Sequence, residues 1–233
     1  MTTDPRASIA EAQQKIMALL KQHGESTMAE LAEHLNVSYE AVRQQLNPLV
    51  ALRLVERLER PNQSGTGRPL RYYSLSSTGD HLFPKNYDEL AVELIDAIGD
   101  ELGTDGLRRV LAALTDEQVA RWEPALEGKD LASRLKALKG IYIENDPFTE
   151  VSEHEGELQL VERNCPFLNV ASKRPALCST TVNVLSRLLG YRVTRTKRFQ
   201  DGDGRCVFHV HLDQPLQSTE FQFESEIEQP TAG

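Results

Sequence analysis

The sequence predicts an α+β fold, with helices in the first part of the chain and antiparallel strands at its end. Three observations predict it. Apolar residues recur at helical spacing through residues 7–50, two strand-like runs at 54–60 and 70–75 flank a loop rich in Gly, Pro and Ser, and polar and apolar residues alternate after residue 148. The chain has 233 residues, of which 39% are hydrophobic, so it can bury a core in one or two domains.

The charge is unevenly distributed. The net charge is −9, but residues 1–80 hold nine Lys/Arg and nine Asp/Glu, and residues 41–71 hold six Arg against two Glu. A nucleic acid responds to the face presented to it, so the overall acidity does not exclude DNA. No apolar run reaches the length of a membrane helix and the N-terminus lacks a signal-peptide pattern, so we expect a cytoplasmic protein.

Residues 7–50 predict three helices. The first spans 7–22, and Gly24 lies just past its end. Ser26 or Thr27 can cap a second helix, which stops at Asn36 because Asn tolerates the left-handed conformation of a tight turn. We expect Val37 to fill the angle between the helices, Ser38 to cap the third helix, and Pro48 to bend it.

One face of the third helix is polar and can reach base edges and phosphates in a DNA groove. An ordinary helical hairpin with a solvated face is the alternative. The basic hairpin that follows favours a winged helix-turn-helix domain over residues 1–83, in which "GTGRP" is the wing tip. The predicted DNA-binding residues are Ser38, Tyr39, Glu40, Arg43, Gln44, Asn47 and, in the wing, Arg68 near the backbone or minor groove.

Residues 84–145 are predicted to form a helical linker and dimerisation region. Residues 87–105 contain seven acids and no base, with apolar residues at helical spacing. Such a helix can pair with its copy in a homodimer or can be an ordinary packing helix, and the sequence favours neither. Two further helices are predicted around 107–114 and 116–140.

The last part of the chain, residues 146–213, is predicted to be a sensor domain of strands and one helix that carries all three cysteines. Cys165 follows a strand, Cys178 lies near a helix start, and Cys206 lies in a hairpin strand, so the three thiols can converge. They can equally be unrelated buried residues or reactive thiols. Zinc is disfavoured because no closely spaced cysteine pair is present. Residues 214–233 are polar and acidic and predict a disordered tail.

The chain resembles the SufR-type iron–sulfur repressors, a group with an ArsR/DeoR-like winged helix and a ligand-binding C-terminal domain. The resemblance is carried by "AVRQQL", "GRP…YYSLSSTGDHLFPKNYDEL", "NCPFLNVA" and "DGDGRCVFHV". It implies a homodimer in which Cys165, Cys178 and Cys206 of each subunit hold one [4Fe–4S] cluster. It also implies that the loaded form binds a palindromic operator upstream of cluster-assembly genes.

Some relatives carry a fourth cysteine that this chain lacks, so the fourth iron takes another protein ligand or a solute, or is lost easily. His209 is the first candidate, followed by His154, Asn164 and Asp203, although His209 lies at an odd spacing from Cys206 and so on the opposite face of a regular strand. A winged-helix repressor that senses thiol redox state or a small ligand without a cluster is the alternative. Enzyme activity is not expected, because no Ser/His/Asp arrangement or phosphate loop is visible.

Overall fold

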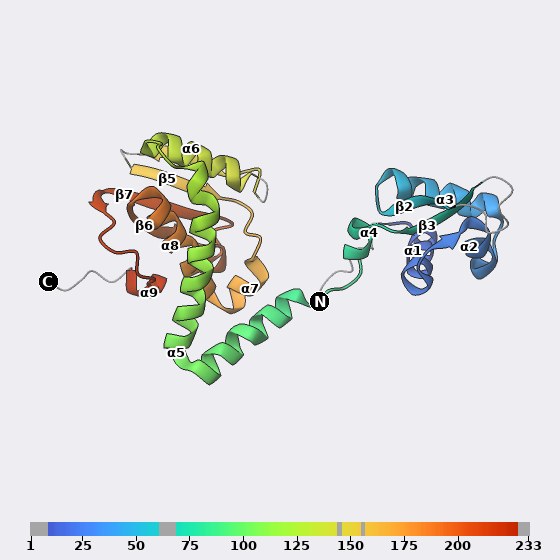
Figure 1. Ribbon diagram of the computed structural model, residues 1–233, viewed down its shortest axis with the longest axis horizontal. Helices are drawn as coiled ribbons and strands as arrows, with labels where there is room; N and C mark the ends of the chain where they lie inside the picture. Colours follow the sequence, from blue (N-terminus) through green and yellow to red (C-terminus); the bar gives the residue numbers. More distant parts are fainter. Residues whose placement is uncertain (1–8, 61–68, 144–145, 155–156, 228–233) are drawn as a thin grey trace. The chain divides into compact units, whose positions relative to one another are not determined.

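The computed structural model describes residues 9–60, 69–143, 146–154 and 157–227, which belong to two compact units, Met1–Asn86 and Tyr87–Gly233 (Figure 1). The first unit contains a helix-turn-helix and the second contains an antiparallel sheet. The predicted α+β class is therefore confirmed. None of the helices in the described ranges combines the length and apolar character needed to cross a membrane.

The N-terminal unit packs three helices against a small sheet. The helices are α1 (Glu11–His23), α2 (Met28–Leu35) and α3 (Tyr39–Ala51). The antiparallel sheet has the order β1 (Ser26–Thr27), β3 (Leu70–Leu75), β2 (Val55–Arg60), and α4 (Ser77–His81) follows it. Its core contains Ile16, Met17, Leu31, Val42, Leu46, Leu49 and Tyr73.

Local side-chain bonds set the turn between α2 and α3. Thr27 and Glu30 form a reciprocal capping box at the start of α2. Asn36 ends α2 with φ 52°, and the Ser38 hydroxyl accepts the amide of Ala41, 3.2 Å away, at the start of α3. The prediction for Val37 is wrong: its side chain is 46% exposed, because the left-handed residue before it turns the chain outward. α3 continues through Pro48 to Ala51.

The C-terminal unit begins with α5 (Tyr87–Trp122), a long helix that is broken once. Gly103 has φ 66° and ψ −175°, which is outside the helical region and accessible to Gly without strain. We call residues 87–102 the first limb and residues 104–122 the second limb; Figure 1 shows the bend between them. The predicted helices at 107–114 and 116–140 are wrong in their bounds, because the second limb runs through the predicted gap to Trp122. A short 3-10 turn, η2 (Glu123–Ala125), and α6 (Leu131–Tyr142) follow.

A four-stranded antiparallel sheet forms the centre of this unit. Its order is β4 (Glu150–His154), β5 (Glu157–Glu162), β7 (Cys206–Pro215), β6 (Tyr191–Lys197). The helix α8 (Cys178–Leu189) and the helix α6 pack on it, and the second limb of α5 packs on α8 (Figure 1). Leu135 and Leu138 of α6 are buried with Leu185 and Phe208 in one core. Residues 84–145, which were predicted to form a helical linker and dimerisation region, supply Leu126, Leu135 and Leu138 to this core.

Shorter elements complete the unit. The helix α7 (Leu168–Lys173) and the 3-10 turn η3 (Pro175–Leu177) lie between the first two cysteines, and η4 (Phe199–Asp201) precedes the third. The last element is α9 (Glu224–Ile227).

The prediction of a disordered tail is wrong for residues 214–227. The amide of Leu216 donates to the carbonyl of Gly190 at 3.0 Å, and Phe221 is 3% exposed. Glu224 is buried against Arg195 in an ion pair with a separation of 2.6 Å. The acidic composition that indicated disorder therefore includes one carboxylate with a buried cationic partner. Residues 228–233 lie outside the described residues.

Candidate nucleic-acid interface and cysteine site

The exposed face of α3 carries the residues predicted to contact DNA. Val42, Leu46 and Leu49 are buried on the opposite side of the helix, and this fixes which face is presented to solvent. The exposed residues of the face are Ser38, Tyr39, Glu40, Arg43, Gln44 and Asn47. Arg68, predicted in the wing, lies outside the described residues.

Arg43 forms a two-point ion pair with Glu40 of the same helix. Its Nε and Nη2 atoms donate to the two carboxylate oxygens of Glu40 at 2.8 and 2.7 Å. The hydrogen bond from Arg43 lowers the pKa of Glu40, so the carboxylate is ionised at neutral pH. The cation of this face is therefore neutralised by its neighbour before any DNA phosphate approaches.

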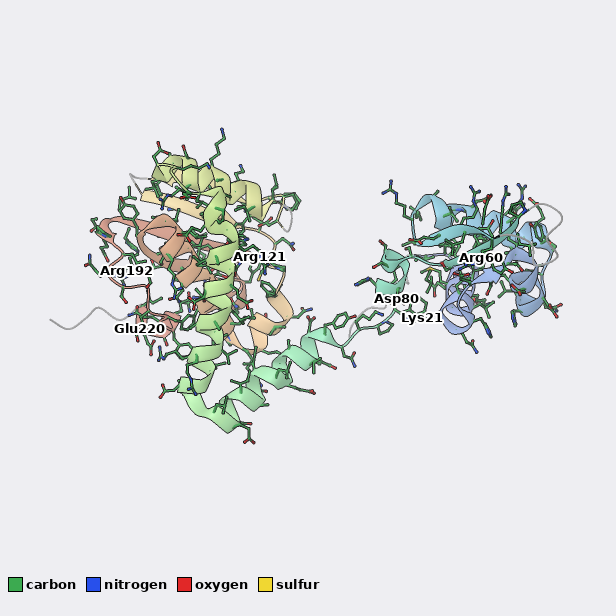
Figure 2. The ribbon with its side chains drawn as sticks, viewed as in Figure 1. Lys21, Arg60, Asp80, Arg121, Arg192 and Glu220 are labelled. Atoms are coloured by element: carbon green, nitrogen blue, oxygen red, sulfur yellow. The ribbon has the colours of Figure 1, made fainter. Side chains whose placement is uncertain are left out.

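Other arginines of the unit are also paired. Arg60 makes a two-point contact with Glu25 at 2.8 and 2.6 Å, and Arg71 contacts Glu59 at 3.3 Å; Figure 2 labels Arg60 together with Lys21 and Asp80, which form a further pair. Within the described part of the chain, Arg53 and Arg57 form no ion pair. Among the arginines of residues 41–71 that the structure describes, these two are the ones without an ion pair. The Arg60–Glu25 pair is distant in sequence, so no local pattern could have predicted it.

The three cysteines come from three elements of the C-terminal unit. Cys165 lies in the turn after β5, Cys178 is the first residue of α8, and Cys206 is the first residue of β7. All three are free thiols; Cys178 and Cys206 are buried and Cys165 is partly buried. The predicted positions after a strand, at a helix start and on a hairpin strand agree with this structure.

The thiols lie close enough for their charges to affect one another. Burial raises the pKa of Cys165 to about 11, and negative charge on Glu162, Cys178 and Cys206 adds to the shift, against a backbone hydrogen bond from Phe167. Burial also raises the pKa of Cys206. As free thiols, these two groups are protonated at neutral pH, so a metal that binds them must displace their protons.

Two nitrogen donors point at the sulfurs. Arg195 Nη1 lies 3.7 Å from Cys206 Sγ, and Gln200 Nε2 lies 3.3 Å from Cys178 Sγ. Arg195 is 6% exposed, and its remaining nitrogens donate to the two oxygens of Glu224 at 2.8 and 2.6 Å. A buried guanidinium beside sulfur is suited to an anionic group held by thiolates, because donors to sulfur stabilise its negative charge.

Two of the residues predicted as a fourth ligand, His209 and Asp203, lie away from the thiols. Cys206, Phe208 and Val210 face the core, so His209, at an odd spacing, lies on the opposite face of the sheet from the Cys206 thiol. Asp203 lies in the exposed turn before β7, where its carboxylate accepts the amide of Arg198 at 3.0 Å. The backbone amide of Asn164 donates a hydrogen bond to the carboxylate of Asp146 at 3.0 Å. The side chain of His154 is outside the described residues.

A buried acidic group beside the cysteines was not predicted. Glu162 is 7% exposed at the end of β5. Burial raises its pKa to about 7, the charge of Asp146 adds to the shift, and the charge of Arg195 and a hydrogen bond from Tyr142 oppose it. Glu162 is the last residue of an alternating strand and falls on its apolar face. An acidic residue at an apolar position of an alternating strand was the sequence feature that could have indicated a buried carboxylate.

Asp146 supports the turn that leads to Cys165. It is 1% exposed, and its carboxylate accepts the amides of Phe148, Arg163 and Asn164 at 2.9, 2.5 and 3.0 Å. Burial alone would raise the pKa of Asp146, but these backbone hydrogen bonds outweigh it and keep the pKa below its ordinary value. The charged carboxylate therefore fixes the backbone next to the first cysteine.

No three His, Cys, Asp or Glu side chains of the described residues are grouped closely enough to hold a single metal ion. A [4Fe–4S] cluster would take one ligand at each of its four irons, and protein thiolates are the usual ligands. Three thiols of separate elements, coupled electrostatically and contacted by a buried Arg, match the donor chemistry of such a cluster. Cys165, Cys178 and Cys206 are the residues that would hold it.

A cavity of about 300 Å³ opens beside two of the cysteines. Cys165, Cys178 and Phe167 line it together with Leu114 and Arg121 of the second limb, of which Arg121 is labelled in Figure 2. Cys206 is not part of its lining. The cavity is a route by which a solute or an oxidant can reach the thiols.

The segment between Cys165 and Cys178 is attached to the first limb of α5. Arg174 forms a two-point ion pair with Asp96, and the Asn169 amide donates to Asp88 at 2.6 Å. Arg187 of α8 forms an ion pair with Asp116 of the second limb through a single nitrogen, Nη1. The cysteine segment therefore contacts the helix whose first residue directly follows the N-terminal unit.

Comparison with known proteins addresses the N-terminal unit. Residues 13–59 match the family model of the DeoR-like helix-turn-helix domain. The N-terminal unit is a DNA-binding domain. The chain is thus a DNA-binding transcriptional regulator, and this domain indicates a regulator rather than an enzyme. The crystal structure of RV1404 from Mycobacterium tuberculosis is 25% identical to this chain, covers 47% of it and 73% of its own length, and has a TM-score of 0.30. No curated protein matches the chain at a significant level.

Proposed function

We propose that this DNA-binding regulator is a repressor that senses an iron–sulfur cluster. In this proposal the exposed face of α3 reads an operator, and Cys165, Cys178 and Cys206 hold a [4Fe–4S] cluster. The genes controlled are those of cluster assembly, as the resemblance to the SufR-type repressors implies. One observation carries the proposal: the charges of Cys178 and Cys206 act on the thiol of Cys165, and the buried Arg195 contacts both Cys178 and Cys206, although the three cysteines come from three different elements.

The surroundings of the thiols support a cluster. When bound, a cluster supplies an inorganic core whose integrity depends on iron supply and on oxidants. Arg195 places a buried positive charge beside Cys206, and Gln200 donates to Cys178. Asp146 holds the turn before Cys165 through three backbone amides. These residues keep the sulfur ligands oriented and offset the negative charge of thiolates.

The connection to DNA binding runs through the first limb of α5. Ligation of Cys165 and Cys178 at both ends fixes the segment between them, and Arg174 and Asn169 of this segment hold the first limb. When the cysteines are released, the segment gains freedom and its hold on the limb weakens. A coupling of about 1–3 kcal/mol between cluster and DNA is enough for regulation.

A homodimer completes the proposal. The first limb exposes large apolar side chains, of which Leu90 and Leu94 are each 54% exposed. Pairing of this surface with a second copy joins two N-terminal units, which then contact half-sites about 34–36 Å apart in a palindromic operator. The acidic outer residues of the limb repel DNA and restrict binding to the N-terminal units.

A second candidate function is a repressor that senses a small ligand or a thiol oxidant without a cluster. The cavity of about 300 Å³ favours it, because Cys165 and Cys178 line a pocket together with both apolar side chains, such as Leu114 and Phe167, and polar ones, such as Gln118 and Arg121. The two candidates differ in whether the isolated protein contains iron and sulfide.

The test is purification of the full chain without oxygen, followed by analysis of iron, sulfide and visible absorbance on the same sample. The proposal expects about four iron and four sulfide per chain, with tighter operator binding by the loaded form than by the chelated form. A protein that binds its operator with equal affinity in both forms, or that takes up no iron during reconstitution, contradicts it. Dependence of binding on a thiol oxidant in iron-free protein would instead support the second candidate.

A further inference from the structure

Glu162 is a buried carboxylate that forms no ion pair with any described residue, although the charge of Arg195 acts on it. It is 7% exposed, and within the described part of the C-terminal unit no Lys, Arg or His nitrogen forms an ion pair with it. The Tyr142 hydroxyl is its hydrogen-bond partner. Burying a carboxylate without a cation is costly, so a position of this kind requires a compensating role. Neither the core packing nor the proposed cysteine ligands explain it.

The sheet places Glu162 directly beside the cysteines. Glu162 of β5 is in register with Cys206 of β7, and the preceding pair on the same face is Leu160 with Phe208. Residues opposite each other in an antiparallel pair project from the same face, with Cβ atoms about 4.5–5.5 Å apart. Leu160, Cys206 and Phe208 all lie in the core, so the Glu162 side chain faces the same side as the Cys206 thiol.

Glu162 is also close to Cys165. Only two residues separate them in the chain, and the charge of Glu162 acts on the thiols of both Cys165 and Cys206. The carboxylate therefore adjoins two of the three proposed ligands from a third direction, the end of β5. A carboxylate has two oxygens, so the bond from Tyr142 leaves acceptor capacity for an iron.

We propose that Glu162 is the fourth protein ligand of the cluster and binds the iron that the three cysteines leave uncovered. This inference rests on the proposed cluster at Cys165, Cys178 and Cys206. The other candidates are less well placed, since His209 lies on the opposite face of the sheet and Asp203 lies in an exposed turn. Carboxylate oxygen is a harder ligand than thiolate, so the iron at Glu162 is the weakest-held of the cluster.

The test uses the full chain, reconstituted without oxygen with ⁵⁷Fe and sulfide, as the natural protein, as Glu162→Gln and as Asp201→Asn. Gln preserves the size of the side chain and removes its charge, and Asp201 is an exposed carboxylate near Cys206 that serves as the matched control. The readouts are the Mössbauer spectrum and the rate at which a ferrous chelator removes iron. We expect one spectroscopically distinct iron in the natural protein and in Asp201→Asn. In Glu162→Gln this iron changes its parameters or is missing, and its release is faster by about tenfold.

The result that overturns the inference is a Glu162→Gln protein with the spectrum and release rate of Asp201→Asn. If Glu162→Gln does not fold, Glu162→Cys decides: a thiolate there slows iron release relative to the natural protein if the position is a ligand, and an unchanged rate overturns the inference. Failure of the proposed function is distinct, because then the natural protein itself incorporates no iron and sulfide.

Discussion

Arg174, between the first two cysteines, forms a two-point ion pair with Asp96 in the first limb of α5. This pair joins the proposed sensing site to the helix that directly follows the DNA-binding unit. In the proposed function, this pair is the route by which changes at the cysteines alter DNA binding. Because the pair is half exposed at the surface, its loss is expected to affect coupling more than stability.

We expect Arg174→Ala to reduce the difference in operator affinity between loaded and cluster-free protein, by up to the coupling of about 1–3 kcal/mol. Iron and sulfide content should not change, because Arg174 contacts no sulfur. Operator titrations by fluorescence anisotropy in both forms measure the effect. Arg187→Ala is the matched control, because Arg187 pairs with Asp116 on the second limb instead. An equal loss of coupling in both variants would contradict a specific role for the first limb.

The Glu40–Arg43 ion pair on the exposed face of α3 is expected to limit contacts of Arg43 with DNA phosphates. Glu40→Gln removes the carboxylate that holds Arg43 and leaves its guanidinium available for phosphate. We expect affinity for unrelated DNA to increase, and the slope of log K against log salt to steepen by about one unit. Arg43→Ala should instead alter sequence preference. Binding to operator and random duplexes at several salt concentrations separates the two effects. An unchanged salt slope in Glu40→Gln would show that Arg43 makes no phosphate contact.

Each cysteine can be tested singly. Replacement of Cys165, Cys178 or Cys206 by Ser removes one thiolate with little change in volume, so we expect loss of the cluster absorbance and weaker operator binding in each variant. Thermal melting of the cluster-free proteins provides the control for folding. A variant that keeps both absorbance and operator affinity removes that residue from the ligand set.

The features that were predicted correctly are those that depend on residues close together in the sequence. The Asn36 turn and the Ser38 cap follow from local side-chain chemistry, and the exposed face of α3 follows from the spacing of Val42 and Leu46. The positions of the cysteines relative to strand and helix ends were predicted for the same reason. Features that depend on distant partners were missed. The most direct example is the tail: its acidic composition indicated disorder, and only the fold places a cationic partner beside one of its carboxylates.

The role of Glu162 and the break in α5 were also not predictable from neighbouring residues alone. Glu162 falls on the apolar face of its strand, but its register with Cys206 is set by the sheet order, which the sequence does not specify. The break at Gly103 requires a backbone conformation that any Gly permits and none demands. The wrong bounds lie beyond the break, where the second limb continues through residue 115 to Trp122.

The lowered pKa of Asp146 leads us to expect that the free energy of unfolding depends on pH. The pKa of its carboxyl is lowered in the folded state, so its stabilising effect is present above the ordinary pKa of 3.8 and is lost as the pH falls through the folded value. We expect Asp146→Asn to reduce the free energy of unfolding by about 1–3 kcal/mol at pH 7, since hydrogen bonds to a charged acceptor are weakened. The difference should shrink below pH 3.8. Urea denaturation across this range measures it, with the exposed Asp100→Asn as control; a difference independent of pH would contradict the assignment.

The buried ion pair of Glu224 with Arg195 indicates that the C-terminal segment contributes to the stability of its unit. Arg195 and Glu224 side chains are 4% and 9% exposed, so Glu224→Gln leaves a buried guanidinium without its counter-charge. Removing one partner of a buried pair costs about 3–5 kcal/mol, and we expect that decrease in the free energy of unfolding of the C-terminal unit.

The control for Glu224→Gln lies on the same helix. Glu226 pairs with Arg108 at the surface, where its side chain is 44% exposed, so Glu226→Gln should cost no more than about 1 kcal/mol. Urea denaturation monitored by the fluorescence of Trp122, which packs against the core of this unit, compares the two variants. Because Arg195 also donates to Cys206, Glu224→Gln is expected to lower the yield of the cluster, whereas Glu226→Gln is not. Equal stability of the two variants would mean that the segment is dispensable for folding, as the acidic composition alone suggests.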